Sequence, residues 1–445
     1  MVEVSGIICN FAAVFVVTEI MNPDIQANQT RQATRYASQQ TSQSVLTTQA
    51  TSRQAPQEGI SLTVQGKPAK RNTVISICKG LAIILMVIGH AEAPDMLTRI
   101  IYTFHMPLFF ITAGYFFSAS SAEEPWRFCA RRFKGLYIPF LKWSVFFLLL
   151  HNVLFYFGIL NETYGNWTGG VTHPYTWRLA GARLLQMVTG MSGYDEFLAG
   201  AFWFFRGLLV ASVLFVVLYR FLGGNGRLSH VQTAALICVG ALAFTAFRIA
   251  GDYTVTVIPN GGMREIWGLF FFGVGVIYRH FEPRIRENFW LFLLYFALIC
   301  GAGWMHFCGM NHRGTLRDLW TLPLTGTVGF LMVHYAARML DRRHNRLCDI
   351  LVFIGDNTLY VLVFHILAYK AVSALKIWHY GLDWGQMGCH MVIHDFRDDG
   401  YWILYSIAGV ALPLLGLLAV RSLRGAGLSQ LSRWIRGYTV FRIRQ

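Results

Sequence analysis

The sequence predicts an all-α fold: a polytopic transmembrane helical bundle of about ten spans, with both termini in the cytoplasm. Of its 445 residues, 54% are hydrophobic and only 14% are charged, whereas an ordinary soluble domain carries about 25% charged residues. Apolar runs of about 20 residues recur along most of the chain, and each matches the hydrocarbon thickness of a bilayer. These two observations exclude a soluble globular protein, and the placement of Lys and Arg, given below, predicts the orientation.

The N-terminal region differs in composition from the rest of the chain. Residues 22–66 are rich in Gln, Thr and Ser and show no apolar period, so they bury too little surface to offset their chain entropy. The apolar stretch 6–20 is short for a spanning helix and lacks a basic n-region. We predict a disordered extension, with a true start at Met21 or later as an alternative. The expected regions are a disordered extension at 1–70, a membrane domain at 71–421 and a basic cytoplasmic tail at 422–445.

Ten apolar segments follow, each long enough to cross a bilayer as a helix. They lie at about 74–91, 97–119, 136–160, 199–221, 231–249, 263–279, 289–307, 319–338, 350–373 and 401–421. Lys and Arg are enriched at cytoplasmic ends of spans. If the segment before the first span is cytoplasmic, 22 Lys and Arg residues flank that side and 8 flank the other. This excess favours ten spans with both ends inside.

The net charge of +15 is therefore a topology signal rather than the footprint of a nucleic-acid-binding protein, and we expect no nucleic-acid partner. The eight cysteines form no CxxC pair and show no Cys/His spacing that suits a tetrahedral metal site. We expect neither a disulfide framework nor a metal.

Seven ionisable residues converge on the outer half of the predicted bundle. An ionisable side chain at the centre of a spanning helix costs about 2.5–3.5 kcal/mol on insertion scales. The seven residues are His90, Glu92, His105, Arg206, Arg264, Glu265 and His365. A satisfied interhelical hydrogen bond is the simpler interpretation of any one histidine. A purely structural bundle has little reason to maintain seven such groups, so we interpret them as a functional site.

Lys79 and His90 lie eleven residues apart, close to three helical turns, so they share one helix face about 16 Å apart along the axis. Lys79 is expected in the cytoplasmic leaflet, near Lys142 and the basic pair Arg131 and Arg132. Two interpretations of Lys79 stand side by side. Its ammonium reaches the interface along an apolar stem, or it binds the phosphates of a polyanionic cytosolic molecule.

Several motifs carry a family resemblance. Ten residues separate Lys79 from His90, and the chain continues with Phe104-His-Met-Pro, Phe202-Trp-Phe-Phe-Arg206 and an Ile354-Gly-Asp-Asn motif that leads to His365. The joint pattern over about residues 71–421 resembles the acyltransferase 3 family of integral-membrane O-acyltransferases, and is most similar to its fucose 4-O-acetylase-like, surface-glycan branch. The family often carries Asp three residues before the cation, where this chain has Ser76.

The resemblance implies ten spans and transfer of an acyl group, usually acetyl from acetyl-CoA, to a carbohydrate hydroxyl. Such a transfer needs a base for the hydroxyl proton and donors for the tetrahedral oxyanion. His90 is the expected base, oriented by Glu92 or Glu265, and His105 and Arg206 are candidates for oxyanion or substrate contacts. The expected site residues are His90, Glu92 and His105 for catalysis, Lys79, Arg131, Arg132 and Lys142 for CoA, and Trp203, Arg206, Arg264, Glu265 and His365 for the substrate.

Two alternatives remain open on the sequence. His90 is also a candidate nucleophile that forms a transient acyl-imidazole, and a transporter or flippase of a sugar or lipid-linked substrate is the rival class, since polar clusters also line transport paths. No internal repeat relates two halves of the chain in support of a transporter. The expected partners are a carbohydrate acceptor, acyl-CoA, the bilayer and glycan-assembly machinery, and the expected location is the bacterial inner membrane as a multi-pass protein.

Overall fold

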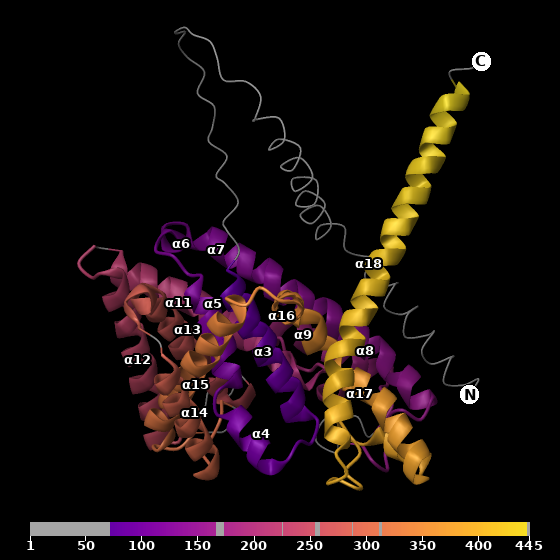
Figure 1. Cartoon of the computed structure of the whole chain (residues 1–445), viewed down its shortest axis with the longest axis horizontal. Helices are drawn as coiled ribbons and strands as arrows, with labels where there is room; N and C mark the ends of the chain where they lie inside the picture. Colours follow the sequence, from indigo (N-terminus) through magenta and orange to yellow (C-terminus); the bar gives the residue numbers. More distant parts are fainter. Residues whose placement is uncertain are drawn as a thin grey trace. The chain divides into compact units, whose positions relative to one another are not determined.

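The computed structural model describes residues 72–165, 173–224, 226–253, 259–286, 288–310 and 314–442, and every regular element within these ranges is helical (Figure 1). The prediction of an all-helical fold is therefore confirmed. The predicted disordered extension at 1–70 lies outside the described residues. The chain divides into two units, of which the larger is Asn72–Leu415. Of the other unit, the described part is the continuation of the last helix, from Gly416 to Arg442.

The larger unit begins with α3 (Thr73–His90), α4 (Asp95–Tyr102), α5 (His105–Tyr115), α6 (Ser120–Glu123), α7 (Pro125–Arg132), the π-helical turn η1 (Phe133–Tyr137) and α8 (Ile138–Tyr156). Next come α9 (Trp177–Gly190), α10 (Glu196–Ala199), η2 (Gly200–Phe202), α11 (Trp203–Gly223), α12 (His230–Ala250), η3 (Pro259–Gly262), α13 (Met263–Phe281), η4 (Glu282–Arg284) and α14 (Phe289–Trp304). The chain ends with α15 (Asp318–Asp341), α16 (Arg346–Asp356), α17 (Thr358–Tyr380), η5 (Trp384–Gly388) and α18 (Tyr401–Arg442).

Seven helical segments in the described part of the chain are long and apolar enough to cross a membrane. They are Thr73–His90, Asp95–Tyr115, Pro125–Tyr156, Glu196–Gly223, His230–Ala250, Thr358–Tyr380 and Tyr401–Leu423. The other three predicted spans coincide with α13, α14 and α15. Helices α13 and α15 are long enough, at 19 and 24 residues, but not apolar enough, and α14 is too short. At 16 residues, α14 is about 24 Å long, less than the roughly 30 Å hydrocarbon core. The count of ten spans stays a prediction.

The structure corrects the boundaries of the predicted span at 350–373. Two helices occupy this range, because α16 ends at Asp356 and α17 begins at Thr358. Between them, the side-chain amide of Asn357 donates to the carbonyl oxygen of Phe353 at 2.7 Å. That bond satisfies one of the carbonyls that a helix leaves without a partner at its C-terminus. The polar Gly355-Asp-Asn sequence thus ends one helix and allows the next to start in a new direction.

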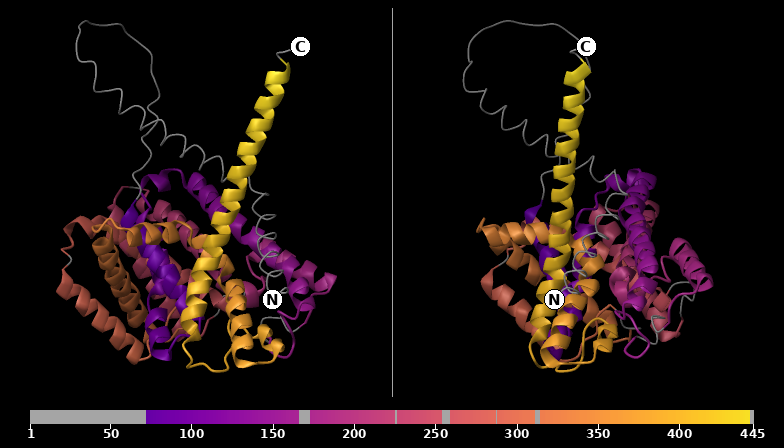
Figure 2. Two further views of the ribbon diagram at one scale, coloured as in Figure 1. Left: turned by 45° about the vertical axis from the view of Figure 1, so that its right-hand side comes forward. Right: turned by 90° about the vertical axis from the view of Figure 1, so that its right-hand side faces the viewer.

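Helix α3 lies inside the larger unit, with α5 and α15 on one side and α16 and α17 on the other (Figures 1 and 2). Glycines permit close crossings around it. A Cβ atom built on Gly355 would lie 1.8 Å from the carbonyl oxygen of Ser76, and one on Gly80 would lie 2.4 Å from that of Leu351. The backbones of α3 and α16 are therefore in direct contact, and the Ser76 hydroxyl also donates to Asp356 at 2.8 Å.

Candidate active site

His90 is the last residue of α3, and two tyrosines from other helices fix this end of the helix. The Tyr369 hydroxyl of α17 donates to the carbonyl oxygen of Val87 at 2.6 Å, and the Tyr102 hydroxyl of α4 donates to that of Gly89 at 2.9 Å. The last carbonyls of a helix have no partner inside the helix, so both hydroxyls satisfy otherwise unpaired groups. The imidazole of His90 is thereby carried on a fixed helix end.

The ring of His90 contacts the ring of His365 on α17. Nδ1 of His90 lies 3.0 Å from Nε2 of His365. Nδ1 of His365 lies 3.1 and 3.0 Å from the carbonyl oxygens of Val361 and Leu362. Carbonyl oxygens only accept hydrogen bonds, so His365 carries its proton on Nδ1 and its Nε2 accepts the proton of His90 Nδ1. This arrangement leaves the lone pair of a neutral His90 on Nε2, and the one ring hydrogen bond found for His90 among the described residues is at Nδ1.

His105 lies close to this pair. Its ring centroid is 5.2 Å from that of Tyr102, which in turn is 6.5 Å from that of His90. Nδ1 of His105 lies 2.9 Å from the carbonyl oxygen of Ile101, so the proton of the neutral ring is on Nδ1 and Nε2 is an acceptor. Of the two roles expected for His105, contact with a substrate hydroxyl fits this tautomer better than stabilisation of an oxyanion.

Glu92 turns away from His90, although it follows by only two residues. It adopts a positive φ of 59°, an uncommon conformation for a residue other than glycine. Its Oε1 accepts a hydrogen bond from Nδ1 of His394 at 2.8 Å and lies 3.8 Å from Nε of Arg397. The hydrogen bond to this carboxylate raises the pKa of His394, against the opposing effect of burial. Glu92 therefore bonds to the loop between α17 and α18, whereas the sequence predicts a bond to His90.

Arg206 and Glu265 form a separate buried ion pair. Nε of Arg206 lies 2.8 Å from Oε1 of Glu265, and both side chains are almost fully buried. The guanidinium of Arg264 lies 4.5 Å from the ring centroid of Trp203. Oε2 of Glu265 is buried with no hydrogen-bond partner among the described residues. Glu265 thus pairs with an arginine rather than with His90, and it retains one oxygen able to accept a hydrogen bond.

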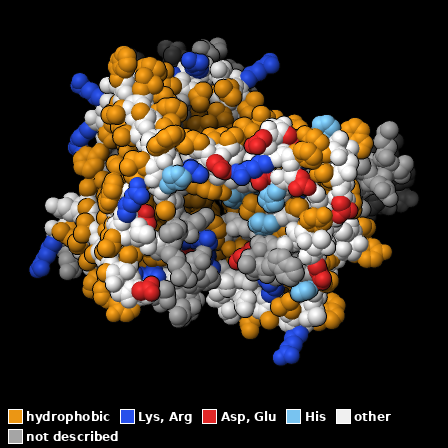
Figure 3. Space-filling model, turned by 90° about the horizontal axis from the view of Figure 1, so that it is seen from below, with side chains coloured by type: hydrophobic (Ala, Val, Ile, Leu, Met, Phe, Trp, Pro, Cys, Tyr) orange, Lys and Arg blue, Asp and Glu red, His pale blue; other side chains and the backbone are white. Residues whose placement is uncertain are grey.

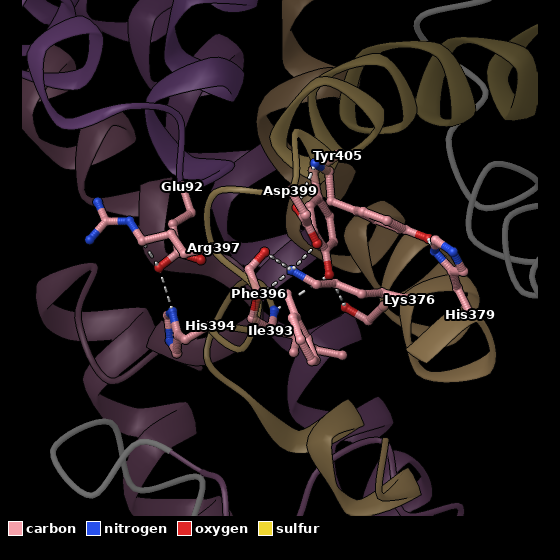
Figure 4. Close-up of polar contacts among 11 residues, drawn as sticks. Glu92, Lys376, His379, Ile393, His394, Phe396, Arg397, Asp399 and Tyr405 are labelled. Atoms are coloured by element: carbon pink, nitrogen blue, oxygen red, sulfur yellow. Dashed lines mark hydrogen bonds and ion pairs between the residues drawn. The ribbon is translucent and has the colours of Figure 1, made fainter. Parts of the chain in front are cut away.

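The loop between α17 and α18 is anchored by a buried lysine. Lys376 is only 1% exposed, and its Nζ lies 3.1 Å from Oδ2 of Asp399 (Figure 4). The same ammonium donates to the carbonyl oxygens of Phe396 at 3.1 Å and Ile393 at 3.4 Å. The sequence places Lys376 in an outer loop, but α17 continues to Tyr380 and encloses it. A buried ammonium requires such acceptors, and the loop supplies them.

A second lysine of α17 anchors the start of the same loop. Nζ of Lys370 donates to the carbonyl oxygens of Met387 and Cys389, each at 2.7 Å, and lies 4.8 Å from the ring centroid of Phe197. Burial and the charge of Lys370 lower the pKa of His390 to about 4, so this histidine is neutral near pH 7. Its Nδ1 is buried and has no hydrogen-bond partner in the described ranges.

The four residues expected to bind CoA lie in different surroundings. Lys79 is half-buried on α3, and the helix runs unbroken to His90, which places the two about 16 Å apart along the axis. Arg132 donates to the carbonyl oxygen of Ala113 at 3.4 Å. Arg131 is exposed, and Nζ of Lys142 lies 4.5 Å from the ring centroid of its neighbour Trp143. Their role in binding CoA stays a prediction.

Another buried histidine, His151 of α8, shows what a structural imidazole looks like here. Its Nδ1 lies 2.6 Å from Oδ2 of Asp195, and its Nε2 lies 3.2 Å from the carbonyl oxygen of His173. The ring also stacks on Tyr175, with centroids 3.5 Å apart. Because both nitrogens already face acceptor oxygens, neither is open to a substrate hydroxyl. His90 differs in having one nitrogen without such a partner.

Polar side chains gather at the end of the bundle that carries His90. Figure 3 shows the molecule from below in the orientation of Figure 1, on the side where α4 and the loop between α17 and α18 lie. Lys and Arg, Asp and Glu, and His side chains line the rim of a hollow on this face. The face thus offers hydrogen-bonding and charged groups of both signs.

The fold and this site define a class: a multi-pass membrane protein that carries a hydrogen-bonded histidine pair at one end of its helical bundle. A family model described as an acyltransferase domain, Acyl_transf_3, matches residues 72–421. The chain therefore belongs to this acyltransferase family and is a membrane acyltransferase. No curated protein and no solved structure matches the chain. The narrower assignment to the fucose 4-O-acetylase-like branch stays a prediction.

Proposed function

We propose that the protein transfers an acetyl group from acetyl-CoA to a hydroxyl group of a cell-surface or lipid-linked carbohydrate, with His90 as general base. The observation that carries the proposal is the hydrogen bond from His90 Nδ1 to His365 Nε2, with the proton of His365 held by two helix carbonyls. It supports a neutral His90 whose Nε2 lone pair is available. A general base of this kind contributes about 10²- to 10⁴-fold to a rate.

In the proposed reaction, Nε2 of His90 takes the proton of the acceptor hydroxyl while the hydroxyl oxygen attacks the thioester carbonyl. The tetrahedral intermediate collapses, the carbon–sulfur bond breaks, and the CoA thiolate takes the proton back from the imidazolium. His365 acts as a positioning residue, because its Nε2 accepts the Nδ1 proton of His90 in both the neutral and the protonated state. The products are the carbohydrate ester and CoA, and the base is restored.

The acceptor is proposed to lie beside the buried pair of Arg206 and Glu265 and the aromatic ring of Trp203. The unpaired Oε2 of Glu265 supports this placement, since a buried carboxylate oxygen gains from a hydroxyl donor. A carbohydrate presents several such donors. In this proposal the protein lies in the bilayer of the bacterial inner membrane and works with glycan-assembly machinery.

The test uses the purified full chain in lipid nanodiscs, with labelled acetyl-CoA and candidate glycans. His90→Ala is expected to lower transfer by at least about 100-fold. His365→Phe is expected to lower kcat by roughly 10- to 100-fold through loss of a buried hydrogen bond of about 1–3 kcal/mol. His379→Phe is the matched control, because His379 lies on the same helix but is exposed and bonds to Tyr401.

Retention of normal transfer by His90→Ala, with the protein still folded, would refute the proposal. In sealed vesicles that contain the protein, movement of a labelled sugar across the membrane without acyl transfer would instead support the transporter. A labelled acyl group trapped on His90 would replace direct transfer by the two-step route through an acyl-imidazole.

A further inference from the structure

Three arginines line one cavity at the opposite end of the bundle from His90. The cavity has a volume of about 280 Å³ and is lined by Ile285, Arg286, Tyr335, Arg338, Met339 and Arg342. Hydrogen bonds connect this region to the start of α3: Asn72 donates to the Tyr115 hydroxyl at 3.2 Å, and Tyr115 donates to Glu282 at 2.6 Å. Because α3 is 18 residues long, this end lies about 27 Å along the helix axis from His90.

The charges around the cavity are unbalanced. Arg338 donates to Oε1 of Glu282 at 2.8 Å, so this guanidinium has a counter-charge and a fixed position. Arg286 and Arg342 are exposed, and neither has a carboxylate partner among the residues that the structure describes. Arg342 is the C-cap of α15 and follows Arg338 by four residues, a spacing at which like charges lie on one face and repel each other. An anion bound between the guanidinium groups relieves this repulsion.

The size and chemistry of the cavity narrow the choice of anion. A cavity of about 280 Å³ lies at the lower end of the range of about 300–1,000 Å³ for ligand pockets, and its three arginines suit an anionic group. Guanidinium groups bind phosphate oxygens through paired N–H donors. The wall also carries Tyr335 and Met339, which provide apolar contact for the remainder of an amphipathic ligand.

We propose that Arg286, Arg338 and Arg342 form a binding site for a phosphate group that belongs to a larger molecule. Two sources present this chemistry at a membrane surface: the headgroup of an anionic phospholipid and the 3′-phosphate of the acyl-CoA donor. The site is distinct from the basic residues expected from the sequence to bind CoA. An acyl-CoA phosphate in this site would rest on the proposed function, whereas a lipid phosphate would not.

The test compares two double variants with the same loss of charge. Arg286→Gln with Arg342→Gln removes two guanidinium groups from the cavity and leaves the bond between Arg338 and Glu282 intact. Arg284→Gln with Arg343→Gln is the control, since both residues are exposed neighbours that do not line the cavity. The full chain is purified in nanodiscs. Binding of acetyl-CoA and acetyl-dephospho-CoA is measured by thermal shift, and retained phosphatidylglycerol by native mass spectrometry.

If the cavity variant retains about tenfold less phosphatidylglycerol than the wild type and its affinity for acetyl-CoA is unchanged, the lipid headgroup is the source of the phosphate. A similar loss of acetyl-CoA affinity, together with weak binding of acetyl-dephospho-CoA by the wild type, supports the 3′-phosphate. If the cavity variant binds phosphatidylglycerol and acetyl-CoA as well as the wild type does, the proposed site is refuted. Arg342→Lys keeps the charge but loses the paired donors, so an intermediate loss is expected even if the double variant is poorly folded. None of these readouts requires acyl transfer, so failure of the site and failure of the proposed reaction are separable.

Discussion

Replacement of Gly355 by alanine tests the close crossing between α3 and α16. The added Cβ would lie 1.8 Å from the carbonyl oxygen of Ser76, whereas real Cβ atoms essentially never approach closer than 3.0 Å. The two backbones must therefore separate by at least about 1.2 Å, because the obstacle is a main-chain atom that cannot rotate away. The hydrogen bond from Ser76 to Asp356 at 2.8 Å spans the same crossing and is strained by the same movement.

Two opposing effects decide whether Gly355→Ala raises or lowers the free energy of unfolding. Alanine is favoured over glycine in a helix by about 1 kcal/mol. Overpacking costs about 1–3 kcal/mol, and loss of the Ser76 hydrogen bond adds about 0.5–1.5 kcal/mol. Gly355→Ala is therefore expected to lower the free energy of unfolding by about 1–3 kcal/mol. Acyl transfer is expected to fall as well, since α3 carries both Lys79 and His90.

The free energy of unfolding is measured by denaturant titration in mixed micelles, followed by tryptophan fluorescence. Gly240→Ala is the matched control, because Gly240 lies inside α12 and a Cβ there meets nothing within 4 Å. The control is expected to gain up to about 1 kcal/mol. Equal stability of Gly355→Ala and Gly240→Ala would show that the crossing is not as close as the structure has it.

Three further predictions concern single side chains. Tyr369→Phe leaves the Val87 carbonyl without its partner. It should lower the free energy of unfolding by about 1–3 kcal/mol in an unfolding assay and lower kcat in a transfer assay. An unchanged kcat would contradict the role of this tyrosine in fixing the position of His90. The raised pKa of His394 means that its ion pair with Glu92 stabilises the loop below pH 6.5 and is lost as pH rises through the raised value. The opening free energy of the loop, taken from hydrogen exchange corrected for the intrinsic rate at each pH, should fall by at most about 1 kcal/mol between pH 6 and pH 8. His394→Gln should abolish this fall. Burial raises the pKa of Glu282, but hydrogen bonds from His334, Tyr115 and Arg338 outweigh this effect and lower the pKa to about 2. The ionised carboxylate therefore adds to the free energy of unfolding above pH 4.5, and this contribution is lost as the pH falls towards 2. Glu282→Gln should remove this part of the loss of stability in acid.

The helical fold and the grouping of functional residues on α3 could be predicted because they follow from local rules. Hydropathy over about 20 residues indicates a spanning helix, and the 3.6-residue period places Lys79 and His90 on one face. The break at Asn357 was missed, since the apolar residues on both sides of it read as one continuous run. Only the capping bond from Asn357 to Phe353 shows where one helix stops.

The partners within the site could not be predicted from sequence. Glu92 is two residues from His90, yet its positive φ and its bond to His394 direct it away. The actual partner, His365, lies 275 residues later in the chain. Which side chains meet depends on the rotation and depth of two separate helices, and hydropathy gives neither. The same limit applies to Lys376, which lies beyond the predicted span at 350–373 but inside α17.

The two lysines of α17 hold the loop before α18 through main-chain oxygens of Met387, Cys389, Ile393 and Phe396. Every amino acid carries a backbone carbonyl, so these four bonds do not depend on which side chain stands at each position. Substitutions in the loop can therefore change the surface it presents while its path over the bundle is kept. Related chains that retain the two lysines are free to diversify this loop, whereas loss of either lysine would release it whatever its sequence.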